Sequence, residues 1–145
     1  MTAVMDQRLN FVTIGARDRE ASRRFYLEGL GWEPILDVPE ITFFQAGPGL
    51  VFGVWGRAEL ETDSTASWPD TGPVGFALAT NMQSAAEVDG AVARAVAAGG
   101  TVLKPGQPAE FGGYHAYVAD PAGVRWEIAY NPGWHVDADG NVTLT

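Results

Sequence analysis

The side chains that could carry chemistry are few, and most of them lie in the last third of the chain. Alternation along two predicted strands places Arg125 and Glu127 on one face, and His115 and Tyr117 on one face of the strand before it. A carboxylate surrounded by aromatic side chains is a suitable proton acceptor, because an apolar environment disfavours its charged form. We therefore interpret Glu127 as a candidate general base and His115 as a second candidate for acid–base chemistry or metal ligation.

Each of these residues also has an ordinary structural interpretation. Glu127 could simply be paired with Arg125 or another cation, because a buried charge needs a partner. A histidine on a strand is often only hydrogen-bonded or exposed, and Gln45 could orient a ligand amide or be a plain polar strand residue. His135 lies in the C-terminal tail and is expected to be structural or exposed.

The elements that must position these residues occur twice along the chain. In the first half we predict a strand at 9–15, a helix capped by Asp18 and ended by Gly29 and Gly31, and strands at 32–36, 41–46 and 50–55. In the second half we predict a strand at 74–79, a helix opened by the capping box Ser84–Glu87, and strands at 101–104, 114–119 and 124–130. Both halves therefore have the order β-α-β-β-β.

The segments outside the repeat are short. Residues 56–73 are rich in Ser, Thr, Pro and acidic residues, which is typical of a solvated tether or of a lid over a binding site. Residues 133–145 are expected to form a hairpin tail that turns at Asp139-Gly140.

The composition of the chain excludes several classes of partner and site. The chain has 145 residues, of which 46% are hydrophobic, and a net charge of −9 that would repel nucleic acid and anionic membranes. With no cysteine it has neither disulfides nor a cysteine-based metal site. No segment is long and apolar enough to span a bilayer, so we expect a cytoplasmic single domain with no nucleic-acid or membrane partner.

Two segments carry a resemblance to a known family. NFVTIGARDREASRRFYLEGLGW near the start and FGGYHAYVADPAGVRWEIAYNP near the end resemble the vicinal oxygen chelate (VOC) superfamily, which includes glyoxalases, bleomycin-resistance proteins and dioxygenases. The second segment is similar to the glyoxalase-related branch. The resemblance implies an α+β fold in which two βαβββ modules form a cupped mixed sheet around a small-molecule cavity. The single domain would comprise one module at about 8–55, the linker 56–73, a second module at about 74–132, and the tail 133–145.

The resemblance also implies where a divalent metal (Zn, Ni, Mn or Fe) would be held. The four ligand positions fall on Phe11, Gly53, Gly75 and Glu127, of which only Glu127 can coordinate a metal. Tight metal sites need about three protein ligands, so we expect no cofactor, with a metal held by Glu127 and atypical donors as the alternative.

Strand alternation combined with the resemblance predicts the lining of the cavity. The predicted ligand-binding residues are Phe11, Phe43, Gln45, Trp55, Tyr117 and Arg125. Such a lining suits an aromatic or cationic small molecule, bound by a homodimer in the manner of bleomycin-resistance proteins. Two alternatives stay open: a metal-dependent lyase, isomerase or dioxygenase of the glyoxalase type, or a metal-free enzyme that uses Glu127 as a base. A dimerising module with no ligand is a third hypothesis.

Overall fold

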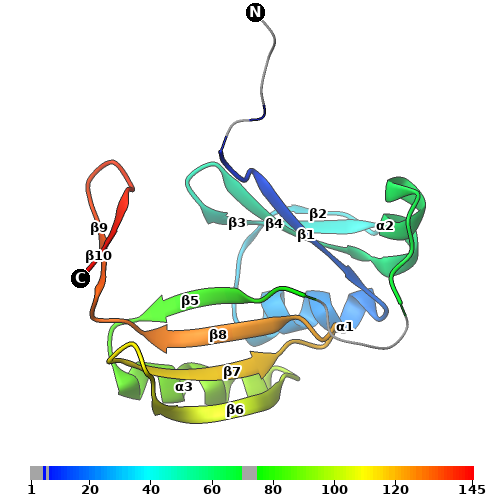
Figure 1. Cartoon of the computed structure of the whole chain (residues 1–145). Helices are drawn as coiled ribbons and strands as arrows, with labels where there is room; N and C mark the ends of the chain where they lie inside the picture. The colour runs from blue at the N-terminus through cyan, green and yellow to red at the C-terminus, as the bar shows by residue number, and fades with distance from the viewer. Residues whose placement is uncertain (1–4, 6, 70–74) are drawn as a thin grey trace, which may run out of the picture.

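The computed structural model describes residue 5 and residues 7–69 and 75–145, and it confirms the repeated α+β architecture (Figure 1). The first module consists of β1 (Phe11–Ala16), α1 (Arg19–Arg24) with the π-helical turn η1 (Phe25–Gly29), β2 (Pro34–Asp37), β3 (Ile41–Gly47) and β4 (Leu50–Gly56). The second module consists of β5 (Leu78–Met82), α3 (Ala85–Ala97), β6 (Thr101–Pro108), β7 (Tyr114–Ala119) and β8 (Arg125–Tyr130). Helix α2 (Arg57–Ser64) follows the first module, and β9 (Trp134–Val136) and β10 (Val142–Leu144) form the C-terminal hairpin.

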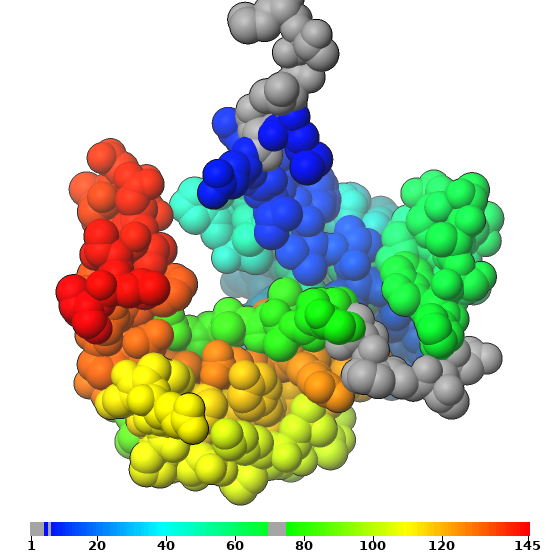
Figure 2. Space-filling model, in the orientation of Figure 1, coloured from blue at the N-terminus to red at the C-terminus, as the bar shows by residue number. Residues whose placement is uncertain are grey.

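Each module forms its own four-stranded sheet. The strand orders are β1-β4-β3-β2 and β5-β8-β7-β6, and in each sheet the first strand pairs in parallel while the other pairings are antiparallel. Among the described residues no ladder joins the two sheets, so β1 and β5 each have a strand neighbour on one side alone. The α+β fold of two βαβββ modules expected from sequence is therefore confirmed, with one mixed sheet in each module; Figure 2 shows the blue-to-cyan first module and the yellow-to-orange second module as two parts of one chain.

Two sequence-based expectations differ from the structure. The strand expected at 74–79 is observed as β5, four residues later, and Val74 lies outside the described residues. Alternating apolar residues continue through this segment, so the pattern fixes which face is buried and leaves the ends of the strand undefined. The expected linker also contains helix α2, whose Leu60 packs close to Gly15 of β1.

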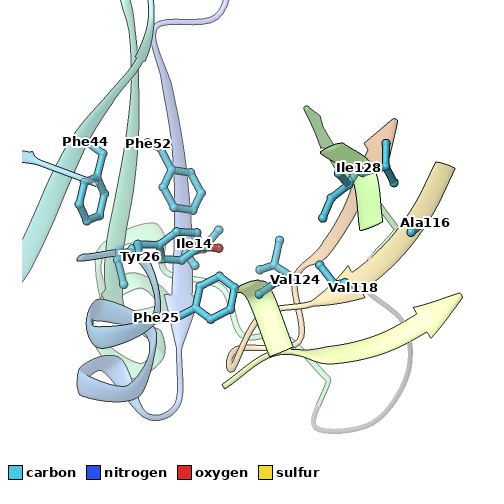
Figure 3. Close-up of a cluster of buried hydrophobic side chains, with 12 residues drawn as sticks. Ile14, Phe25, Tyr26, Phe44, Phe52, Ala116, Val118, Val124 and Ile128 are labelled. Carbon is cyan, nitrogen blue, oxygen red and sulfur yellow. The ribbon is translucent and has the colours of Figure 1, made fainter. Parts of the chain in front are cut away.

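One hydrophobic core holds the two modules together (Figure 3). We call the face of each sheet that packs toward the helices its inner face. Side chains from both inner faces, from α1–η1 and from α3 form the core cluster: Ile14, Phe25, Tyr26, Phe44, Phe52, Val54, Val88, Ala95, Ala116, Val118, Val124 and Ile128. Helix α3 begins at the predicted cap, where Ser84 accepts a hydrogen bond from the Glu87 amide. None of the described helices is long and apolar enough to cross a membrane.

A buried polar network also crosses between the modules. The Tyr26 hydroxyl donates to Asp120 Oδ2 at 2.5 Å, and Trp126 Nε1–H donates to the Tyr26 oxygen at 3.0 Å. Asp120 also accepts hydrogen bonds from the amides of Ala122 and Val124, which closes the turn before β8. Burial, followed by the charge of Asp120, raises the pKa of Tyr26 well above its usual value. This network fixes η1 of the first module against β8 of the second.

Candidate functional site

The polar side chains predicted on β7 and β8 do share one face. His115, Tyr117, Arg125 and Glu127 lie on the face of the second sheet opposite its helix, which we call the outer face, while their neighbours in sequence pack inward. The register pairs Tyr117 with Glu127, which brings the two strands' polar groups side by side. The structure therefore brings together the part of the predicted site that lies in the second module.

Glu127 and His115 form the centre of this site. His115 Nδ1 lies 2.7 Å from Glu127 Oε2, and the two side chains are 13% and 25% exposed. On the other side of the ring, Nε2 lies 3.1 Å from the Lys104 ammonium. Because an ammonium only donates, Nε2 must accept, and the ring proton therefore lies on Nδ1 and is donated to Glu127. The partner of Glu127 on this face is therefore His115 and not Arg125.

Lys104 and Phe111 belong to this site although neither was predicted from sequence. Simple alternation from Val102, which faces Val118, would pair Lys104 with Ala116 on the inner face. The strand is interrupted by a bulge between Val102 and Lys104, and the extra residue pairs Lys104 with Tyr117 instead. The ammonium therefore reaches His115 across the outer face, and no short-range sequence signal marks this change of direction.

Two aromatic rings flank the histidine. Tyr117 and Phe111 each meet the His115 ring edge-on, with ring centroids 5.6 Å apart in both cases. Burial, followed by the charge of Glu127 and a hydrogen bond to it, raises the pKa of the Tyr117 phenol. Tyr117 is therefore kept as a neutral hydroxyl beside Glu127. The half-exposed Phe111 leaves an aromatic surface open to solvent at this side of the site.

An open groove of about 690 Å³ runs beside these residues. It is lined by Gly75, Phe76, Ala77, Leu103, Lys104, Tyr117 and Arg125. Its walls thus combine two cationic side chains with apolar and aromatic ones, the combination that binding sites for small organic molecules commonly have.

The rest of the predicted lining lies on the other sheet. Phe11 and Phe43 pack edge-to-face on the outer face of the first sheet, with centroids 5.4 Å apart. Gln45 is exposed there and donates to the backbone oxygen of Gly47, and Trp55 lies against α2. Because the two sheets are separate, these four residues border no described cavity together with Glu127.

The structure also corrects one of the four predicted metal-ligand positions. In the strand register Gly53 faces Thr13, and Glu127 faces Ala79. Thr13 and Ala79 are therefore equivalent positions. Phe11 precedes Thr13 by two residues, so its counterpart is Ala77, two residues before Ala79, and not Gly75.

The correction does not add a metal ligand, since alanine has no donor atom. In the described ranges, no three side chains of the Asp, Glu, His or Cys types converge on a point. Both ring nitrogens of His115 are already engaged with Lys104 and Glu127. Among the described side chains of this face, Glu127 and His115 carry the usual metal-ligand atoms, and both are engaged with protein partners.

A hollow larger than this groove lies elsewhere, beneath α2, and measures about 870 Å³. Three of the charged side chains that line it, Arg57, Glu61 and Arg19, make contacts within the fold. Arg57 Nε lies 2.7 Å from Glu61, and Arg19 donates to the backbone oxygens of Val38 and Glu40. His135 is likewise structural, since its Nε2 lies 2.9 Å from the hydroxyl of Thr145 within the C-terminal hairpin. Size alone therefore does not identify the site.

Comparison with known proteins agrees with this architecture. The profile of the Glyoxalase/Bleomycin resistance protein/Dioxygenase superfamily matches residues 8–128. A glyoxalase-related enzyme from Fulvimarina pelagi is 43% identical and superimposes with a TM-score of 0.86, covering 96% of this chain and 99% of its own. A lactoylglutathione lyase from Agrobacterium tumefaciens is 25% identical, with a TM-score of 0.63 and coverage of 86% and 94%. No curated protein sequence matches this chain.

Proposed function

The chain belongs to the Glyoxalase/Bleomycin resistance protein/Dioxygenase superfamily, and from this premise we propose that it binds a small organic molecule without a resident metal. The binding surface is the outer face of the second sheet. The observation that supports this proposal most directly is the hydrogen-bonded chain Lys104–His115–Glu127, in which the imidazole and the carboxylate bind protein partners. The adjoining groove is lined by apolar and cationic side chains.

The same chain of hydrogen bonds argues against a metal at this position. A cation on His115 Nε2 would have to displace the Lys104 ammonium, and a cation on Glu127 would compete with the His115 N–H. Breaking those contacts would leave partly buried charged groups without their partners, which is costly. Glu127 and His115 together supply two donors, fewer than the three that stable sites need.

We propose that a second copy of the chain completes the site. The first sheet's outer face carries Phe11 and Phe43. In the part of the chain that the structure describes, edge strand β1 of this sheet and β5 of the second sheet each lack a partner on one side. Phe11 is 53% exposed, and Leu36, which pairs with Phe43 from β2 at the other edge of the sheet, is 40% exposed. A two-fold arrangement that pairs β1 of one copy with β5 of the other would place the apolar face of one protomer opposite the polar face of its partner. The predicted residues on the two sheets would then share one cavity.

An enzymatic role is the alternative. His115 Nδ1 and Glu127 Oε2 lie 2.7 Å apart. A metal-dependent lyase, isomerase or dioxygenase could use the two side chains as metal ligands, and a metal-free enzyme could move a proton between them. The atypical donor expected from sequence, Gln45, is on the first sheet and engaged with Gly47. A second copy of the chain would bring the outer face of its first sheet to this site. The described residues at the centre of that face are Phe11, Thr13, Phe43 and Gly53, and none of them is a usual metal ligand.

Elemental analysis coupled to thermal unfolding tests the proposal. The purified chain should contain no stoichiometric Zn, Ni, Mn or Fe, and its Tm should not rise in their presence. A metal present at about 100 times its Kd would add roughly 2.7 kcal/mol of stability, which is readily detected. A stoichiometric metal whose stabilisation disappears in Glu127→Gln but persists in Glu20→Gln, an exposed carboxylate on α1, would favour the enzymatic alternative.

Light scattering tests the second copy. The chain should have twice its monomer mass of 15.5 kDa, and Phe11→Glu should shift the equilibrium toward monomer. A wild-type chain that stays monomeric at high protein concentration would contradict the shared site.

A further inference from the structure

The charge of the second sheet's outer face differs from that of the whole chain. The chain has nine Lys and Arg residues against eighteen Asp and Glu. The groove beside Tyr117 nevertheless presents two of the nine cations, Lys104 and Arg125, and none of the described residues that line it is acidic. The nearest carboxylate on this face, Glu127, is directed to His115.

The ion pairing of this face leaves one cation in excess. The Lys104 ammonium, the neutral His115 ring and the Glu127 carboxylate form a continuous chain whose two end charges offset one another. Arg125 is not part of that chain. Within residues 7–69 and 75–145 its guanidinium makes no hydrogen bond or ion pair, although it alternates with Glu127 on the same strand. An exposed guanidinium with all its donors available can hold a carboxylate through two parallel hydrogen bonds.

The surroundings of Arg125 indicate what kind of molecule carries that anionic group. Phe76 and Leu103 are 46% and 49% exposed and line the same groove, and Tyr117 forms part of its wall. The Lys104 ammonium uses one of its three N–H groups for His115, so donors remain for a second contact with an anion.

We propose that Arg125, assisted by Lys104, is a carboxylate-binding subsite for an aromatic or otherwise apolar organic acid whose body lies against Phe76, Leu103 and Tyr117. This inference rests on the proposed binding function and defines its ligand class. It keeps the aromatic ligand that the predicted lining suggested and replaces the cationic alternative with an anionic one. The acidic surface elsewhere would slow the approach of an anion, but it is screened within about 8 Å at physiological salt, so the groups that contact the ligand decide its charge.

Three probes of the same shape and different charge test the proposal. Naphthalene-2-carboxylate, naphthalene-2-carboxamide and naphthalene-2-carboxamidine have charges of −1, 0 and +1, and their affinities for the full-length protein are measured by titration calorimetry. We expect the carboxylate to bind about tenfold more tightly than the amide, since a hydrogen bond to a charged group contributes at least that much. The amidine should bind most weakly.

Two variants that remove the same charge locate the effect. Arg125→Gln should weaken carboxylate binding about tenfold and leave amide binding within twofold. Arg24→Gln, on the exposed surface of α1, changes the net charge equally and should change neither. Both positions are exposed, so both variants should fold, which their circular dichroism verifies.

The outcomes separate this inference from the function on which it rests. If all three probes bind equally, or Arg125→Gln has no more effect than Arg24→Gln, the carboxylate subsite is wrong while the binding function stands. If the amidine binds most tightly, the ligand class is cationic and the inference is overturned. If none of the probes binds, the proposed binding of aromatic molecules fails together with the inference.

Discussion

Replacing Tyr26 by Phe removes a single oxygen atom from the contact between the two modules. Tyr26 is fully buried and Asp120 is 4% exposed, so water cannot replace the lost hydrogen bond. Asp120 keeps two backbone donors, from Ala122 and Val124, but loses its 2.5 Å contact, and the Trp126 N–H loses its acceptor. A buried hydrogen bond to a charged group contributes about 1.5–3 kcal/mol, so we expect the free energy of unfolding to fall by about 2–3 kcal/mol.

Urea unfolding followed by tryptophan fluorescence measures this loss, and thermal unfolding should show a Tm lower by roughly 5–10 °C. The matched control is Tyr114→Phe, whose hydroxyl donates at 2.8 Å to Asp89 on the surface, where water can take its place. Its effect should be less than half as large. A loss below about 0.5 kcal/mol for Tyr26→Phe would refute the idea that this network joins the modules, because that is the lower limit for a formed hydrogen bond.

The same network predicts a dependence on alkaline pH. Burial raises the pKa of Tyr26 in the folded state above that of the unfolded chain, near 10. The unfolded phenol therefore loses its proton first, so the contribution is complete below about pH 10 and is lost as the pH rises further. Wild-type stability should decline above pH 10 more steeply than that of Tyr26→Phe, and parallel curves would contradict the assignment.

Two further predictions concern stability. Hydrogen bonds from Arg23 at 2.6 and 3.0 Å lower the pKa of Asp37 to about 2. The ionised Asp37 therefore stabilises the folded state by about 1 kcal/mol after screening by solvent, and this stabilisation is present above about pH 4 and is lost as the pH falls toward 2. The free energy of unfolding of Asp37→Asn should change less with pH over that interval than that of the wild type. Gly29→Ala should destabilise by roughly 1–3 kcal/mol in urea unfolding, because the new Cβ would lie 2.2 Å from the Cβ of Ala98. Gly90→Ala, where the new Cβ meets nothing within 4 Å on α3, should instead stabilise by up to about 1 kcal/mol, and equal effects at the two glycines would contradict the packing described here.

Much of the fold could be predicted because it depends on local signals. The helix cap at Ser84, the positive-φ turn at Gly123 and the alternation in β7 and β8 are each specified within a few residues. The prediction of which β8 side chains face inward and which outward is correct for the same reason. The predicted start of β5 is wrong, because a two-residue period continues beyond the strand and only its partner β8 determines where pairing begins.

The site was only partly predictable because two of its features depend on tertiary structure. Lys104 reaches the outer face through a bulge in β6, and no sequence period indicates an inserted residue. The separation of Phe11 and Phe43 from Glu127 depends on which way the two modules pack, and this packing is set by contacts such as Tyr26–Asp120, 94 residues apart. A pattern read within one strand contains no information about either.

The most direct test of the central claim is to locate a bound ligand by ¹H–¹⁵N NMR in protein freed of metal with EDTA. Adding naphthalene-2-carboxylate should produce saturable shifts at Leu103, Tyr117 and Arg125, with the Arg125 Nε–H signal among them. Shifts that are confined to the hollow beneath α2, or that arise only after Zn²⁺ or Ni²⁺ is restored, would contradict a metal-independent site on the outer face of the second sheet.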